Sequence, residues 1–302
     1  MMTVLHCIIS FLITMEFVLG IVANGFIVLV NCIDWIDRQK ISSVDQVLTA
    51  LAVSRIGLLW ILLLSWHANV LNSVSLNLYV KMIVSIVYML ANHFSVWLAT
   101  VLSIFYLLKI ANFSSFLFLY LKKRVRSVLI IVLLVSLLFL SSNFGIASFI
   151  NILTNRRNMT HNTTLVKVAH LSNITVFTLA NFIPFTMSLI SLVLLIVSLS
   201  NHLKKMQVNG KGFEDPSTKV HIRAMQTVTS FLLLFAGYIL ALIITVWNSN
   251  NLKNSSVLML CQIFGIMYPS KHSFVLIWGN KKLKHIFLSF LRHLRCQSKE
   301  RK

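Results

Sequence analysis

Polar side chains interrupt one long apolar stretch, residues 80–115, at two separate places. Tyr88 and Asn92 are four residues apart and Tyr106 and Lys109 are three apart, so each pair would lie on one face of a helix. Tyr88 and Asn92 could together contact a small molecule, although Asn92 could also be a hydrogen-bonding strut between helices. At about 1.5 Å per residue, Asn92 and Tyr106 would lie roughly 21 Å apart along the axis. The stretch is therefore typical of a helix that reports an event at one of its ends to the other.

The rest of the sequence offers little for catalysis. Its apolar segments contain no paired carboxylates, and the sequence has no Gly-x-Ser-x-Gly and no His-Glu-x-x-His; the one Asp within the apolar segments is Asp45, at the edge of the second. The four cysteines have no metal-binding spacing and no close pairs, so we expect neither a metal site nor structural disulfides. These cysteines are Cys7, Cys32, Cys261 and Cys296. We predict that the chain is not an enzyme and needs no cofactor.

The composition indicates a membrane protein. Of the 302 residues, 57% are hydrophobic and only 11% are charged, which is less polar surface than a soluble protein of this size needs. The formal net charge of +20 would suggest nucleic-acid binding in a soluble protein. Here the basic residues lie between the apolar segments, where they favour a membrane orientation instead. The sequence predicts a chain that crosses the membrane several times and binds no nucleic acid.

Seven apolar segments are each long enough to form a spanning helix. They cover residues 7–33, 44–66, 80–108, 127–153, 175–199, 224–247 and 257–278. The predicted fold class is an all-α membrane protein, a bundle of seven transmembrane helices followed by a short amphipathic cytoplasmic helix. The bundle would form one domain, residues 1–280, and the tail, residues 281–302, a second unit. Pro184 and Pro269 lie inside the fifth and seventh segments and predict bends there.

Lysine and arginine are distributed unequally between the two sides of these segments. Twenty of them follow the first, third and fifth segments or lie in the tail, whereas about five lie on the opposite side. Because basic residues favour cytoplasmic loops, the amino terminus would lie outside and the tail in the cytosol. Asn158, Asn162 and Asn173 begin Asn-x-Ser/Thr sequons in the second outer loop, so they agree with this orientation and are candidate glycosylation sites.

The tail has an apolar face with basic flanks. Its apolar residues recur at helical spacing: Leu283, Ile286, Phe287, Phe290 and Leu294. A helix of this kind lies on the membrane surface and contacts membrane lipids. Cys296 at its end is either a palmitoylation site or an unmodified thiol.

Arg55 would lie about 11 residues into the second segment, roughly 16 Å deep and near the bilayer centre. A charge at that depth is costly and is normally held by partners. We expect Arg55 to form a structural or switching network with Asn24 and backbone carbonyls, too far inward to touch a ligand. On the third segment, His93 would serve packing and Trp97 would anchor a neighbouring helix.

Motifs in order along the chain carry a family resemblance. They are Asn24-Gly-Phe-Ile, Leu51-Ala-Val-Ser-Arg55, Leu98-Ala-Thr, Phe105-Tyr-Leu-Leu-Lys-Ile-Ala-Asn-Phe-Ser, Pro184-Phe, Ser198-Leu-Ser-Asn-His-Leu-Lys-Lys-Met-Gln, Asp215-Pro-Ser-Thr-Lys-Val-His and Tyr268-Pro-Ser-Lys-His-Ser-Phe-Val-Leu-Ile-Trp-Gly-Asn-Lys-Lys-Leu-Lys. The commonest class of G-protein-coupled receptor is not matched, because acidic-Arg-Tyr and Asn-Pro-x-x-Tyr are missing from the third and seventh segments. The chain instead resembles the type 2 taste receptors, the bitter receptor family, over essentially its whole length.

The resemblance implies a plasma-membrane receptor for bitter small molecules that signals through a gustducin-like heterotrimeric G protein to phospholipase C and calcium release. The ligand-binding residues that it implies are Trp66, Tyr88, Met89, Asn92, Phe177, Asn181, Tyr238, Gln262 and Gly265. Structural or switching roles fall to Asn24, Arg55, Pro184, Pro269 and His272, and G-protein coupling to Tyr106, Lys109, His202 and His221. Many relatives have Trp where this chain has Tyr88, so the floor of the pocket would be smaller and would carry a hydroxyl.

Other functions are open at this point. The nearest alternative is another small-molecule chemosensory receptor of the same kind. A small-solute transporter is the rival from another class, but it would normally show repeated halves and helices broken at matching positions, and the sequence shows neither. Tyr106 and Lys109 could also be an interfacial aromatic and a positive-inside residue with no role in coupling.

Overall fold

A computed structural model describes residues 2–38, 42–70, 78–157, 163–208, 216–248 and 255–300. Within these ranges the chain is helical apart from short turns, and no strand occurs there. The helices are α1 (Met2–Arg38), α2 (Ser43–Val70), α3 (Leu78–Ile110), α4 (Phe116–Lys123), α5 (Val125–Arg157), α6 (Thr163–Val208), α7 (Pro216–Asn248), α8 (Ser255–Gly279) and α9 (Lys281–Glu300).

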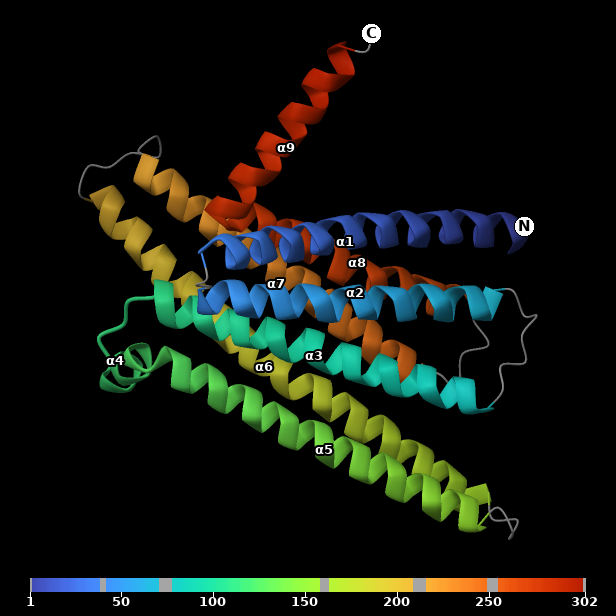
Figure 1. The fold of residues 1–302 in the computed structure, drawn as a ribbon. Helices are drawn as coiled ribbons and strands as arrows, with labels where there is room; N and C mark the ends of the chain where they lie inside the picture. Colours follow the sequence, from blue (N-terminus) through green and yellow to red (C-terminus); the bar gives the residue numbers. More distant parts are fainter. Residues whose placement is uncertain are drawn as a thin grey trace.

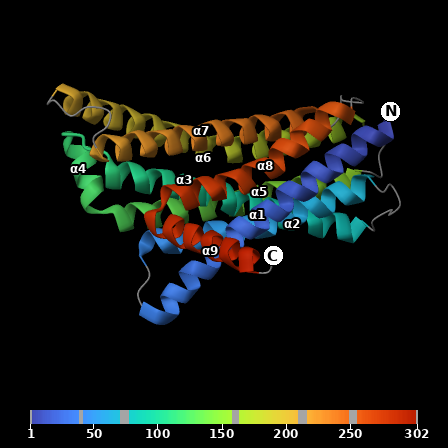
Figure 2. The ribbon, with the colours of Figure 1, turned by 90° about the horizontal axis from the view of Figure 1, so that it is seen from above.

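Seven long helices lie side by side in one bundle, with α3 in its interior (Figures 1 and 2). Helix α3 packs against α2, α5 and α6, and α8 packs against α1, α2 and α7. We compared the apolar 18-residue part of each spanning helix. In α3, 72% of these residues are buried inside the protein, whereas in α5 only 17% are. The stretch with the two polar pairs is therefore the central helix, and α5 exposes most of its surface to the membrane.

Six of the helices in the described ranges, α1, α2, α3, α5, α6 and α7, are long and apolar enough to cross a membrane. Helix α8 packs among them but carries the polar run Ser270-Lys271-His272-Ser273 in its middle. Three of these four residues, Ser270, His272 and Ser273, are buried, so they contact other helices rather than lipid. The chain is an all-α membrane protein with a seven-helix bundle, as the sequence predicts.

One glycine sets how closely α1 approaches its neighbours. A Cβ atom at Gly20 would lie 2.6 Å from Ser270 Oγ on α8 and 2.7 Å from Leu59 Cδ1 on α2. Both distances are too short for a Cβ atom, so a larger residue at this position would displace the side chain of Ser270 or Leu59. The hydroxyl of Ser270 donates a 2.7 Å hydrogen bond to the carbonyl oxygen of Glu16 on α1.

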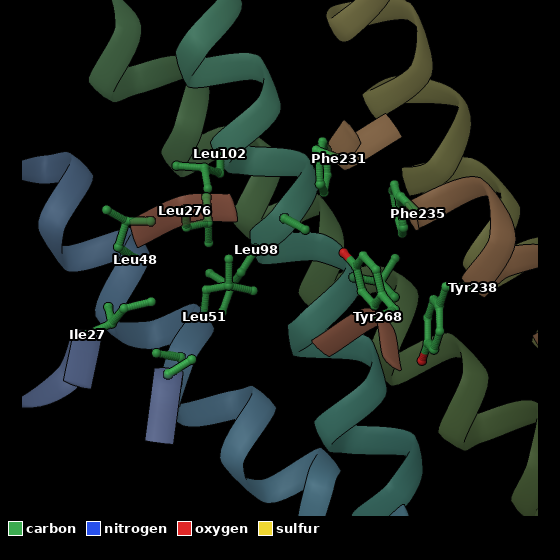
Figure 3. Packing of buried hydrophobic residues seen from close by; sticks show 14 of the residues in the cluster. Ile27, Leu48, Leu51, Leu98, Leu102, Phe231, Phe235, Tyr238, Tyr268 and Leu276 are labelled. Atoms are coloured by element: carbon green, nitrogen blue, oxygen red, sulfur yellow. The ribbon is translucent and has the colours of Figure 1, made fainter. Parts of the chain in front are cut away.

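The helices meet around several clusters of buried apolar residues, and Figure 3 shows part of one that joins α1, α2, α3, α7 and α8. Aliphatic side chains of α1, α2 and α3, including Ile27, Leu51 and Leu98, fill one part of this core. Aromatic rings of α7 and α8 fill the other, where Phe235 and Tyr268 stack with their centroids 5.4 Å apart (Figure 3). The core thus joins helices from both ends of the sequence.

At one end of the bundle lie α4 and the start of α9, and the amino terminus lies at the other (Figure 1). We call these the α4 end and the N-terminal end. The side chain of Asn280 accepts hydrogen bonds from the backbone N–H groups of Lys282 and Leu283, which begins α9. Leu283 is buried in the core and Phe287 packs edge-on against Phe26, so the first turns of the amphipathic helix dock on the bundle.

Candidate ligand-binding site

A cavity of about 200 Å³ lies between α3, α5 and α6. Its lining residues are Met89, Asn92, His93, Trp97, Leu140, Asn143, Val176, Phe177, Ala180 and Asn181. We call it the α3–α5–α6 cavity. Four of the residues predicted to bind a ligand, Met89, Asn92, Phe177 and Asn181, come together here, although they are up to 92 positions apart in the sequence.

The two buried amides of the cavity are held in fixed positions by the protein. Asn92 Nδ2 donates a 2.9 Å hydrogen bond to Asn181 Oδ1, and Asn181 Nδ2 donates one of 2.8 Å to the Phe177 carbonyl within α6. The side-chain oxygen of Asn92 accepts a hydrogen bond from the hydroxyl of Tyr238 on α7. Asn92 therefore joins α3 to α6 and α7 by hydrogen bonds, and it also lines the cavity.

Two tyrosines lie directly behind Asn92. Tyr238 is buried and shares a side-chain hydrogen bond with Tyr88, so the predicted ligand-binding tyrosines contact each other. Tyr238 also stacks on Tyr268 of α8, with a 4.6 Å centroid distance and an interplanar angle of 22°. Figure 3 shows these two rings side by side in the core. The wall of the cavity is thus continuous with the aromatic core.

Tyr268 leads on to the fully buried Arg55 of α2. Arg55 Nη2 donates to Tyr268 Oη at 3.3 Å and Nη1 donates to Ser273 Oγ at 3.3 Å. Its guanidinium carbon also lies 5.2 Å from the centroid of the Tyr268 ring, a cation–π distance. Nη2 further contacts Nδ1 of His272. Because a guanidinium only donates, His272 must accept at Nδ1 and is the neutral Nε2–H tautomer.

The partners of Arg55 differ in kind from those we expected. They are side chains of α8 rather than backbone carbonyls, and Asn24 joins the network one step further on. Ser273 Oγ donates to Asn24 Oδ1 at 2.7 Å, and Asn24 Nδ2 donates to the carbonyl oxygens of Gly20 and Pro269. The reason is spacing, because Tyr268 and His272 are one helical turn apart on α8 and Ser273 follows directly, so all three reach Arg55 of α2.

The prolines of the predicted switch lie inside helices that continue past them. The carbonyl oxygen of Pro269 accepts hydrogen bonds from Asn24 and Ser273. That of Pro184 accepts one of 3.0 Å from Thr100 Oγ1, which ties α6 to α3. At both prolines, the carbonyl oxygen therefore accepts a hydrogen bond from a side chain of another helix.

Three other predicted ligand-binding residues lie away from this cavity. Trp66 is buried among α1, α2 and α8, where its Nε1 donates a 3.0 Å hydrogen bond to Ser10 Oγ. Gln262 is half-buried and Gly265 is buried on α8. A Cβ atom at Gly265 would meet no other atom within 4 Å, so there is room beside this glycine. Whether these residues bind a ligand stays a prediction.

At the α4 end, the residues predicted for coupling lie around the end of α3. Tyr106 packs in the core between α3 and its neighbours, whereas Lys109 is exposed. His202 on α6 lines a second cavity of about 270 Å³ with Asn112, Asn201 and Lys205. The side chains of His221 and Asn173 lie outside the described residues, as do Asn158 and Asn162 altogether.

Two residues of the cavity were assigned other roles from the sequence. His93 and Trp97 line it together with Asn143 of α5. Trp97 does anchor α5, because it stacks on Phe139 with a 5.7 Å centroid distance. The available signal was the four-residue spacing of Met89, His93 and Trp97, which places all three on one face of α3.

Comparisons with known proteins agree with this architecture along the whole chain. A family described as "Taste receptor protein (TAS2R)" matches residues 1–295. The chain is 55% identical over 302 residues to "Taste receptor type 2 member 20" of Homo sapiens, covering 99% of this chain and 98% of that protein. It is 55% identical over 298 residues to "Taste receptor type 2 member 46" of Homo sapiens, covering 98% and 96%. The chain therefore belongs to the taste receptor type 2 family of G-protein-coupled receptors, which is a family of receptors and not of enzymes.

Proposed function

We propose that the chain is a receptor for bitter small molecules and activates a gustducin-like heterotrimeric G protein, and through it phospholipase C and calcium release. The observation that best supports this proposal is the unbroken series of contacts from the α3–α5–α6 cavity to the Arg55 network. It runs from Asn181 through Asn92, Tyr238 and Tyr268 to Arg55. A ligand that binds the amides at one end acts on the same side chains that hold α2, α7 and α8 together.

The steps of this coupling follow from the hydrogen bonds. A ligand acceptor that takes the Nδ2 donor of Asn92 replaces Asn181, and the amide then turns relative to the Tyr238 hydroxyl. Tyr238 is stacked on Tyr268, so its movement changes the ring that faces Arg55. A ligand shifts the equilibrium only if it binds one arrangement of these side chains better than the other. The switching roles of Asn24, Arg55, Pro184, Pro269 and His272 belong to this proposal.

Neutral, moderately apolar compounds are the agonists that the site favours. No carboxylate lies among the residues that line the cavity. Glu16, an acid in the apolar part of α1, is paired with Lys271 at 2.9 Å and is therefore already neutralised. An ammonium group would find no counter-charge at the cavity wall, whereas rings and hydrogen-bonding groups find aromatic side chains and amides.

The proposed orientation puts the amino terminus outside the plasma membrane and the α4 end in the cytosol, where Tyr106, Lys109, His202 and His221 would meet the G protein. Asn158, Asn162 and Asn173 would then be available for glycosylation. The basic residues that favour this orientation number twenty on the inner side against about five on the outer side.

The proposal is tested by nucleotide exchange on a purified gustducin-type heterotrimer, with a panel of bitter compounds and the full-length receptor in lipid nanodiscs. At least one compound should accelerate exchange. Tyr238→Phe should reduce this response, since it removes the hydroxyl that bonds Asn92 and keeps the ring stack. Trp60→Phe, at an exposed position on α2, is the control and should respond like wild type. A panel without any agonist-dependent exchange would overturn the proposal.

A further inference from the structure

Asn143 of α5 presents a side-chain amide that the protein does not use. It is half-buried and lines the α3–α5–α6 cavity. Within the described ranges, no donor or acceptor bonds this amide, and neither its oxygen nor its nitrogen is fully buried. The other two amides of the cavity differ, because Asn92 and Asn181 are buried and bond each other. Asn143 is therefore the amide of this cavity that a ligand can reach.

The position of Asn143 along α5 shows that its side chain faces the protein and not the lipid. Val132 and Ser136 are buried on the side of α5 that packs against α3, and Phe139 stacks on an aromatic ring of that helix. Asn143 continues this series, since positions 132, 136, 139 and 143 lie on one face at 3.6 residues per turn. Leu134, on the opposite face, is 57% exposed, as expected beside lipid. The amide of Asn143 therefore points into the space between α5 and α3, where the cavity lies.

From this position we infer that Asn143 is a specificity-determining contact of the cavity and selects ligands that carry a neutral carboxamide on a flat apolar ring system. Its side chain offers an acceptor and a donor next to each other, which is the complement of a carboxamide. The ligand N–H donates to Oδ1, and the ligand carbonyl oxygen accepts from Nδ2–H. Leu140, Val176 and Phe177 supply an apolar wall for the rings. This inference rests on the proposed function, for which it names the ligand class.

Selectivity follows from what happens when a ligand cannot pair with Asn143. A ligand of the same shape without hydrogen-bonding groups covers the amide and leaves it unpaired, and a site rejects such an analogue more strongly than it rejects a small change in apolar size. Asn92 and Asn181 already have hydrogen-bond partners, so they contribute less to this choice. No Asp, Glu, Lys or Arg lines the cavity, so a charged ligand group would gain no ion pair there.

The test is binding of three probes to the purified full-length chain in lipid nanodiscs, measured as ligand-dependent thermal stabilisation and corrected for probe partitioning into empty nanodiscs. The probes are 2-naphthamide, 2-acetylnaphthalene, in which a methyl group replaces the NH₂ group, and naphthalene, which has no hydrogen-bonding group. Asn143→Leu keeps the size of the side chain and removes both hydrogen-bonding groups. Asn143→Ala removes the same groups by truncation. Ser142→Ala, at the neighbouring exposed position of α5, is the control.

In wild type, 2-naphthamide should bind about 3- to 10-fold more tightly than 2-acetylnaphthalene, the range of one net hydrogen bond. Asn143→Leu and Asn143→Ala should both abolish this difference, and Asn143→Leu should leave naphthalene binding unchanged. Ser142→Ala should bind all three probes as wild type does. The inference is overturned if wild type does not prefer 2-naphthamide, if either Asn143 variant keeps the preference, or if Asn143→Leu loses naphthalene to the same extent as 2-naphthamide.

Binding and signalling fail separately in this design. If the probes bind with the expected pattern but no bitter compound drives nucleotide exchange, the role of Asn143 in binding stands and the proposed function falls. If compounds drive exchange while Asn143→Leu and Asn143→Ala bind every probe as wild type does, the function stands and the role of Asn143 falls.

Discussion

Replacing Tyr268 with Phe isolates one hydrogen bond to the buried charge of Arg55. The substitution removes the hydroxyl that accepts from Arg55 Nη2 at 3.3 Å. It keeps the ring, which stacks on Tyr238 at 4.6 Å and on Phe235 at 5.4 Å. The change in packing is therefore small, and the effect should come from a guanidinium that has lost one of its acceptors.

The magnitude follows from the type and length of that bond. Hydrogen bonds to charged groups contribute about 1.5–3 kcal/mol, and a distance of 3.3 Å lies at the long end of the normal range, so we expect about 1.5–2 kcal/mol. For a chain of 302 residues, with an unfolding entropy of about 2.1 cal/mol/K per residue, that corresponds to a fall in Tm of roughly 2–3 °C. Arg55 Nε already lacks a partner among the described residues, so no spare acceptor compensates for the loss.

The assay is thermal unfolding of purified wild type, Tyr268→Phe and the exposed-tyrosine control Tyr120→Phe in the same detergent. The control should unfold within about 1 °C of wild type, because exposed substitutions change stability by at most about 0.5 kcal/mol. The rank order of agonists should stay the same for Tyr268→Phe, since Tyr268 does not line the cavity. Equal Tm values for Tyr268→Phe and Tyr120→Phe would refute the view that this bond stabilises Arg55.

Four further predictions concern single positions. Arg55→Ala should change surface expression or basal signalling because it leaves the acceptors of α8 unpaired, and a changed agonist rank order with normal expression would count against this. Lys109→Ala should lower maximal calcium release with little change in agonist affinity, because the exposed end of α3 is remote from the cavity. An equal loss of agonist binding would contradict a role of Lys109 in G-protein coupling. Gln262→Glu should shift dose–response preference from a neutral toward a protonated bitter compound, and an unchanged ratio would place the pocket elsewhere. Asn158→Gln should abolish most of the glycosidase-dependent mobility shift, whereas a shift equal to that of wild type would assign the glycan to another sequon.

The sequence by itself determined the class, the helices and the family. Long apolar segments without charge can only be spanning helices, because lipid offers no partners to an irregular backbone. The central place of α3 was also foreseeable, since its polar residues need partners on several sides. The depth of Arg55 required that it have partners, and the structure supplies them from side chains of α8 in place of the expected backbone carbonyls. The division into domains at residue 280 stays a prediction.

The tertiary structure alone decided which side chains meet. Arg55 finds His272 across 217 positions, and Trp66 turns toward Ser10 of α1 rather than the α3–α5–α6 cavity. His93 and Trp97, which we expected only to pack against neighbouring helices, line a cavity because α5 and α6 leave a space beside that face of α3. Local periodicity gives the face on which a residue lies. It does not give the rotation and tilt of the neighbouring helix, which depend on how all the side chains between the helices fit together.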